Sequence, residues 1–94
     1  MASFRGQFLW YECLTQDVMR AQAFYTSVMG WGTQAWTTPD GTYNMWTVGE
    51  RAIGGVTKMP PEAEAPPHWL AYIGTPDADA TTARAVALGA QVLM

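Results

Sequence analysis

The sequence has few of the residue types on which many functional sites depend. Among its 94 residues it has one cysteine, Cys13, one histidine, His68, and five lysines and arginines. A lone cysteine forms neither an internal disulfide nor a cysteine metal cluster, and such sparing use is typical of a reducing compartment. Because phosphate binding needs a basic patch, the scattered cations and the net charge of −3 argue against a nucleic acid partner.

Long apolar runs are also absent. No run approaches the roughly 18 residues that span a bilayer, and residues 1–9 lack the apolar core and cleavage site of a secretory signal. We therefore expect a cytoplasmic protein without a membrane partner. What the chain does have is 49% hydrophobic and only 14% charged residues, which is typical of one compact soluble domain.

The first half of the chain reads as a strand, a helix and three further strands. Residues 8–15 are rich in aromatic and branched side chains, which favours a strand. Asp17 then offers a helix cap, apolar residues recur at three- and four-residue spacing, and Gly30 offers a C-terminal stop. Strands are expected next at residues 32–38, 42–48 and 51–57. Within the last of these, Gly54-Gly55 suggests a bulge or a close approach of two backbones.

A proline-rich linker separates this unit from a partial second one. Residues 58–67 contain four prolines and cannot continue a sheet. Residues 68–74 then read as a strand, residues 78–88 as a helix closed by Gly89, and residues 91–94 as the start of a further strand.

Two stretches of the chain repeat the same strand-to-helix junction. Residues 10–17 read WYECLTQD and residues 70–77 read LAYIGTPD, a shift of sixty residues that keeps the threonine and the aspartate in place. Each stretch precedes a predicted helix that ends at a glycine, Gly30 or Gly89. We therefore predict one structural domain with a first unit at 1–57, a linker at 58–67 and a partial second unit at 68–94.

These motifs resemble the glyoxalase, bleomycin-resistance and extradiol-dioxygenase superfamily, also called the vicinal oxygen chelate superfamily. The matching stretches are WYECLTQD at 10–17, AFY at 23–25, MGW at 29–31, PHWL at 67–70 and ALG at 87–89. The resemblance implies an α+β fold of paired βαβββ modules, with a cupped mixed sheet and helices on its outer face. The second module would be truncated after its second strand, which leaves strand edges open.

The resemblance also implies metal-ligand positions that this sequence fills with other residue types. Metal-binding members place a His, Gln or Glu seven residues before the acid that opens each helix, where this chain has Trp10 and Leu70. A further ligand is a Glu on the fourth strand, yet residues 51–57 contain no acid. The last ligand would lie on an eighth strand, which this sequence does not contain. Indole and aliphatic side chains cannot donate a lone pair to a divalent cation, so we expect neither a metal nor another cofactor.

One face of the first strand supplies the main candidates for ligand binding. Alternation along the strand puts Trp10 and Glu12 on the same face, which the resemblance turns toward the cavity. The sixty-residue shift adds the equivalent positions of the second unit, and the many aromatic residues suggest rings that stack on a flat ligand. The alternative is that these rings fill the core or an interface. The predicted ligand-binding residues are Trp10, Glu12, Trp46, His68, Leu70 and Tyr72.

Glu12 and His68 are the candidate catalytic residues. A carboxyl group in an apolar cup suits a general base, and imidazole suits a proton partner because it ordinarily titrates near neutrality. The alternatives are a glutamate at a wet cavity mouth or paired with an arginine, and a structural histidine at a strand entrance. Cys13 falls on the helix-facing side of the first strand, where we expect a buried small hydrophobe.

The preferred hypothesis is a metal-free small-molecule binding protein of the glyoxalase and bleomycin-resistance type, which holds an apolar or aromatic ligand in its cup. One alternative is an isomerase or lyase that uses Glu12 as base. The other is a scaffold that dimerises without a ligand. Because unpaired backbone groups are costly to bury, the open strand edges also predict a homodimer, which strand exchange could form.

Overall fold

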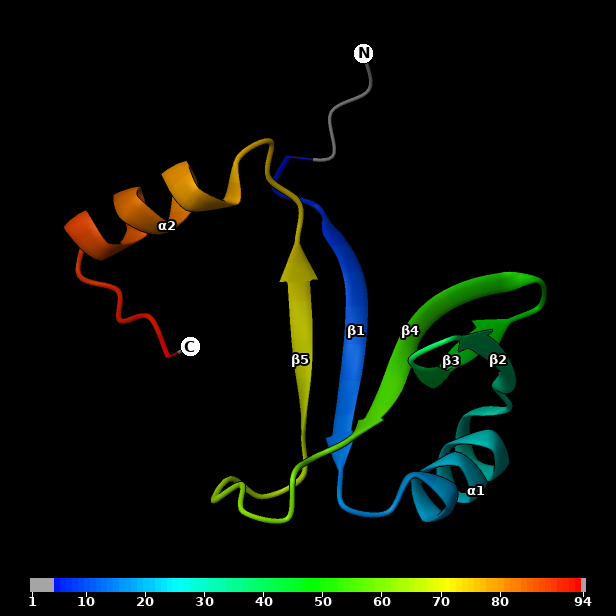
Figure 1. Cartoon of the computed structure of the whole chain (residues 1–94). Helices are drawn as coiled ribbons and strands as arrows, with labels where there is room; N and C mark the ends of the chain where they lie inside the picture. The colour runs from blue at the N-terminus through cyan, green and yellow to red at the C-terminus, as the bar shows by residue number, and fades with distance from the viewer. Residues whose placement is uncertain (1–4, 94) are drawn as a thin grey trace.

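A five-stranded mixed sheet and two helices make up the computed structural model, which describes residues 5–93 (Figure 1). The elements are β1 (Phe8–Thr15), α1 (Val18–Met29), β2 (Gly32–Thr38), β3 (Gly41–Val48), β4 (Arg51–Lys58), β5 (His68–Ile73) and α2 (Ala78–Ala87). The predicted α+β class is confirmed. The predicted bounds of these seven elements differ from the observed ones by at most one residue.

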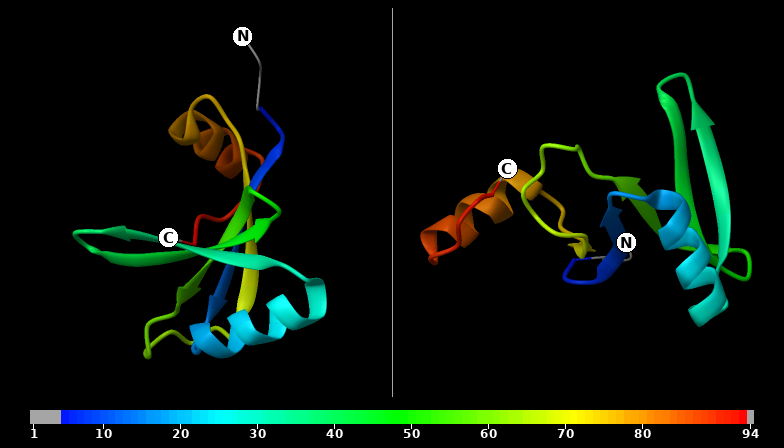
Figure 2. Two further views of the ribbon diagram at one scale, coloured as in Figure 1. Left: turned by 90° about the vertical axis from the view of Figure 1, so that its right-hand side faces the viewer. Right: turned by 90° about the horizontal axis from the view of Figure 1, so that it is seen from below.

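The strand β1 joins the two halves of the chain in one sheet. The strand order is β2-β3-β4-β1-β5, in which β1 pairs in parallel with β4 and antiparallel with β5. Its aromatic and aliphatic residues suit a strand with a neighbour on each side. The β2–β3 hairpin turns between Thr38 and Gly41 and curls out of the plane of β1 and β5, so the sheet is cupped (Figure 2).

Both helices begin at the aspartates that the repeat marks. Asp17 accepts a hydrogen bond from the backbone N–H of Arg20 at 3.1 Å, and Asp77 accepts one from Ala80 at 3.0 Å. These side chains satisfy backbone donors that the first helical turn leaves unpaired. Gly30 ends α1 in the left-handed conformation, with φ of 71°, as its predicted stop role requires. Within residues 5–93, no helix combines the length and the apolar character that crossing a membrane requires.

The two helices differ in how they meet the sheet. α1 packs on the convex face, against β4 and β2 (Figure 2). α2 extends beyond β5 at the end of the sheet, and none of its residues is buried (Figure 1). The expected position of a helix on the outer face is therefore confirmed for α1. Residues 5–93 form no sheet of a second module against which α2 could pack.

The core lies between α1 and the sheet. Trp46 is fully buried there, and its indole Nε1 donates a hydrogen bond to Gly55 O at 3.0 Å. Cys13 is 5% exposed, which confirms the expected buried small hydrophobe. Burial, and then the nearby charge of Glu12, raise the pKa of the Cys13 thiol, so this cysteine is a poor nucleophile. The buried cluster is Cys13, Trp46 and Val56, with Val18, Ala21, Tyr25, Trp31 and Ile53 packed around it.

The close backbone approach predicted at Gly54-Gly55 is confirmed. A Cβ atom on Gly54 would lie only 2.1 Å from Tyr11 O, so no other residue lets β4 come this near to β1. The register between β3 and β4 also shifts beside this point, because Trp46 pairs with Gly54 while the next residue pairs with Ala52. The shift is a bulge of one residue in β4.

The strand predicted at residues 91–94 does not form. Residues 91–93 have no regular structure, and Met94 lies outside the described residues. Val92 and Leu93 are 54% and 87% exposed, so the apolar run neither pairs nor packs. A short apolar run becomes a strand only where a neighbouring strand accepts its backbone groups, and residues 5–93 provide none at this position.

Trp46→Phe should destabilise the fold, because it leaves a gap in the core and removes the hydrogen bond to Gly55 O. We expect the free energy of unfolding, measured by urea denaturation, to fall by about 1–3 kcal/mol. Trp36→Phe is the matched control, since Trp36 is 60% exposed on the edge strand β2. Its replacement should cost less than about 0.5 kcal/mol. Equal losses in the two variants would contradict the assigned core.

Candidate functional site

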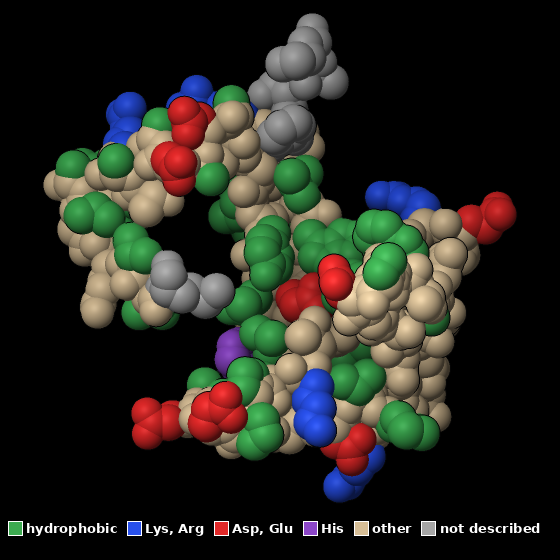
Figure 3. All heavy atoms as spheres, viewed as in Figure 1, with side chains coloured by type: hydrophobic (Ala, Val, Ile, Leu, Met, Phe, Trp, Pro, Cys, Tyr) green, Lys and Arg blue, Asp and Glu red, His purple; other side chains and the backbone are tan. Residues whose placement is uncertain are grey.

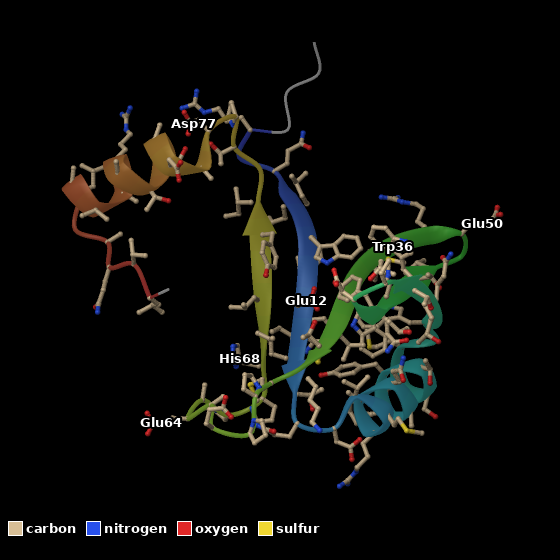
Figure 4. All side chains as sticks on the ribbon, in the orientation of Figure 1. Glu12, Trp36, Glu50, Glu64, His68 and Asp77 are labelled. Atoms are coloured by element: carbon tan, nitrogen blue, oxygen red, sulfur yellow. The ribbon has the colours of Figure 1, made fainter. Side chains whose placement is uncertain are left out.

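The sheet face turned away from α1 brings together five of the six predicted ligand-binding residues. They are Trp10, Glu12, His68, Leu70 and Tyr72. The β1–β5 register pairs Trp10 with Tyr72 and pairs Glu12 with Leu70. Paired residues of neighbouring strands present their side chains on the same face. In Figure 4, Glu12 lies between β1 and the β2–β3 hairpin, and His68 lies at the beginning of β5.

The carboxylate of Glu12 is the polar centre of this face, and its residue is only 7% exposed. Its Oε1 accepts hydrogen bonds from Trp10 Nε1 at 3.1 Å and from Tyr43 OH at 2.5 Å. Its Oε2 accepts one from the Thr57 hydroxyl. Donors on β1, β3 and β4 therefore hold a single carboxylate, and hydrogen bonds to a charged acceptor are stronger than neutral ones. The same bonds fix the Trp10 indole and the Tyr43 ring.

Gly55 makes room for this arrangement. A Cβ atom at this position would lie 1.7 Å from Tyr43 OH and 2.9 Å from Glu12 Oε1. Because the absent side chain leaves that space open, the Tyr43 hydroxyl reaches across β4 to the carboxylate on β1. We call the surface formed by Trp10, Glu12, Tyr43, Leu70 and Tyr72 the cup.

Tyr43 and Thr57 are site residues that the sequence alone did not reveal. Each lies far from Glu12 in the chain, at separations of 31 and 45 residues. The available signal was Gly54-Gly55, since a glycine inside a strand often marks close approach by another group. The glycine pair alone does not identify the side chain that enters the space, because that depends on the register of the neighbouring strands.

The hydroxyl of Tyr43 holds its proton tightly. Burial raises the pKa of Tyr43 from 10.0 to about 12, and its hydrogen bond to Glu12 adds to the rise. Ionising this phenol would place a second negative charge beside the carboxylate. Tyr43 is therefore a hydrogen-bond donor to Glu12 over the physiological pH range.

His68 shares the face with Glu12 but not its hydrogen bonds. Its Nδ1 lies 2.7 Å from Pro66 O, and the partners of Glu12 are Trp10, Tyr43 and Thr57. The two candidate catalytic residues are thus on one face without direct contact. Their catalytic roles stay predictions.

Trp46 is the predicted ligand-binding residue that the structure puts elsewhere. It lies on the α1 face, fully buried, so its assignment to one cup with Trp10 is wrong. The register is the reason, because Trp46 lines up with Gly54 and Tyr11 rather than with Glu12. Trp46 packs in the core, and a ligand contact of its ring stays a prediction. A cavity of about 460 Å³ opens on the same side, with Tyr11, Tyr25, Trp31, Trp46 and Trp69 in its wall.

The described residues do not fit a metal of the kind that the resemblance implies. Trp10 and Leu70 occupy the expected ligand positions and have no lone pair to donate. Within residues 5–93, no three His, Cys, Asp or Glu side chains gather closely enough to hold an ion.

Tyr43→Phe should weaken the alkaline pH dependence of stability. Because the pKa of Tyr43 is about 12 in the folded state and 10.0 ordinarily, its proton stabilises the fold below pH 10, and this contribution is lost as the pH rises from 10 through 12. Over this range the free energy of unfolding, from urea denaturation, should fall less in Tyr43→Phe than in the wild type. Tyr11→Phe, on the other face, should follow the wild type. Equal pH dependence in all three proteins would contradict the assignment.

Comparison with known proteins gives relatives that are longer than this chain. No family profile matches the sequence. CFP32 of Mycobacterium bovis, whose name provisionally calls it a glyoxylase, is 38% identical over 89 residues, which are 90% of this chain and 34% of that protein. CFP32 of Mycobacterium tuberculosis gives the same identity and coverage.

A second kind of relative comes from Streptomyces. The anthracycline biosynthesis protein DauV of Streptomyces sp. strain C5 is 29% identical over 87 residues, which are 93% of this chain and 32% of that protein. The chain thus spans about a third of the length of the curated relatives it matches. Together with the βαβββ order of the first unit and the mixed sheet, these similarities support the predicted resemblance to the glyoxalase, bleomycin-resistance and extradiol-dioxygenase (vicinal oxygen chelate) superfamily.

Proposed function

We propose that the protein binds a small molecule in the cup, where an apolar or aromatic ligand rests on the sheet. The observation that carries this proposal is a buried carboxylate, that of Glu12, beside apolar side chains that remain accessible. Leu70 and Tyr72 are 40% and 49% exposed on the neighbouring strand. Ligand sites typically combine a mostly apolar wall with a few fixed polar groups. In Figure 3 this face is hollowed, with acidic and hydrophobic side chains side by side in the hollow.

The rings of the cup favour a flat ligand. Trp10 and Tyr43 are held in place by their hydrogen bonds to Glu12. A ring that is already fixed loses little conformational entropy when a ligand stacks on it. Each aromatic pair contributes about 0.5–1.5 kcal/mol beyond the burial of its area. Tyr72 adds a third ring, next to Trp10 in the register.

The names of the relatives agree with a small-molecule role. DauV is named for the biosynthesis of anthracyclines, and the name of CFP32 provisionally calls it a glyoxylase. These names concern proteins about three times as long as the present chain, so the ligand of this chain is our proposal.

The hydrogen bonds of Glu12 bear on both binding and base catalysis. A general base must accept a proton from the substrate in the reaction. Glu12 accepts three hydrogen bonds, two at Oε1 and one at Oε2, so one acceptor position of the carboxylate is left for a substrate proton. Glu12 acts in this proposal as a fixed acceptor that orders the rings. The isomerase or lyase alternative, with Glu12 as base, rests on that one position.

Tyr72→Ala should weaken ligand binding in the cup. Titration with a panel of planar aromatic compounds, followed by tryptophan fluorescence, should give saturable quenching in the wild type and an affinity at least about fivefold lower in Tyr72→Ala. Tyr11→Ala is the matched control, because Tyr11 is 44% exposed on the other face and lines the cavity beside α1. A loss of affinity in Tyr11→Ala alone would move the ligand to that cavity. Absence of saturable quenching with every compound would remove the proposal.

We further propose that the protein acts in the cytoplasm as a homodimer. The buried free thiol of Cys13 is compatible with a reducing compartment. Within residues 5–93, β5 pairs only with β1, so its outer edge carries backbone groups open to another strand.

Pairing of two β5 edges should give a native mass of twice 10.3 kDa. Light scattering after size exclusion measures this mass, and the intact chain mass from mass spectrometry is its control. A native mass equal to the chain mass at every concentration would exclude the dimer.

A further inference from the structure

Within residues 5–93, the hydrogen-bond partners of the Glu12 carboxylate at the centre of the cup include no cation. The three groups that bind the Glu12 carboxylate are an indole, a phenol and an alcohol, from Trp10, Tyr43 and Thr57. All three are neutral. Glu12 is nevertheless only 7% exposed, and a buried charge without a charged partner is costly. Such a site gains most from a ligand that supplies the missing positive charge.

The carboxylate also keeps one free acceptor position. Oε1 accepts from Trp10 and Tyr43, whereas Oε2 accepts from Thr57 alone. A carboxylate oxygen has two lone pairs, so Oε2 retains room for one more donor. An N–H group that carries a positive charge makes the strongest bond there, because both partners are ionised.

The rings around Glu12 favour a cation as well. The face of a Trp or Tyr ring attracts a positive charge within about 6 Å of its centre, and the attraction grows when water is excluded. Trp10 and Tyr43 donate to the carboxylate through the N–H and O–H groups at their ring edges, and Tyr72 pairs with Trp10 in the β1–β5 register. The net charge of −3 attracts cations from a distance in addition.

The Lys and Arg side chains in Figure 3 lie outside the hollow between β1 and the hairpin. A glutamate in an apolar hollow whose hydrogen-bond partners among residues 5–93 are neutral and largely aromatic is an arrangement that favours organic ammonium ions.

From these contacts we infer that the ligand of the cup carries an organic ammonium group, which donates to Glu12 Oε2 and lies against the rings of Trp10, Tyr43 and Tyr72. The inference rests on the proposed binding function and narrows its ligand class from any flat aromatic compound to a cationic one. The aromatic part of the ligand would extend over Leu70 along β5.

The test compares two soluble probes that differ mainly in charge, 2-phenylethylammonium and 2-phenylethanol, at pH 7. Binding is followed by the NMR shift of the Trp10 indole N–H, which reports on the Glu12 hydrogen bond. We expect the wild type to bind the ammonium at least about tenfold more tightly than the alcohol. Equal affinities would overturn the ammonium inference and leave the proposed function in place. Absence of binding by both probes and by the planar panel would overturn the two together.

Two variants locate the effect. Glu12→Gln keeps the shape of the side chain and removes its charge, so the ammonium affinity should fall about tenfold while the alcohol affinity changes less than about threefold. Glu50→Gln removes the same charge at the exposed turn after β3 and should retain the wild-type affinities (Figure 4). An equal loss in both variants would show long-range attraction only and would overturn the contact with Glu12. The wild-type comparison of the two probes decides the inference even if Glu12→Gln does not fold.

Discussion

The close approach of β4 to β1 at Gly54-Gly55 is the constraint on which both the fold and the site depend. Gly54 lets the two backbones meet, because a Cβ atom there would lie 2.1 Å from Tyr11 O. Gly55 leaves the space through which Tyr43 reaches Glu12. Any larger residue at either position would separate the parallel strands or displace the hydroxyl. One pair of glycines thus couples the central strand pairing to the polar centre of the cup.

The strand β1 separates two very different environments one residue apart. Cys13 faces the aromatic core under α1, where Trp46 is fully buried. Glu12 faces the cup, where the described partners of its carboxylate, from Trp10, Tyr43 and Thr57, are neutral. The period of two along a strand makes this separation possible, because neighbouring side chains point to opposite faces. The proposed site and the hydrophobic core therefore share a backbone without sharing side chains.

The cup belongs to both halves of the repeat, although the halves are unequal. Leu70 and Tyr72 come from β5 of the second half and lie beside β1 of the first. The helices that follow are capped alike, by Asp17 and Asp77, yet α1 covers the sheet and α2 does not. A side-chain cap forms within one turn of chain, whereas helix packing needs a surface that other strands must build. The two halves of the repeat therefore share the same capped strand-to-helix junction, although their helices pack differently.

The sequence by itself determined the features that act over a few residues. It located the strands, both caps, the stop at Gly30 and the shared face of Trp10 and Glu12, since turn chemistry and alternation are local. Only the tertiary structure decided which faces meet. Strand register brought Tyr43 and Thr57 to the carboxylate, sent Trp46 to the core and left residues 91–93 without a strand partner. Alternation fixes which residues of one strand share a face, but the pairing of distant strands fixes what that face touches.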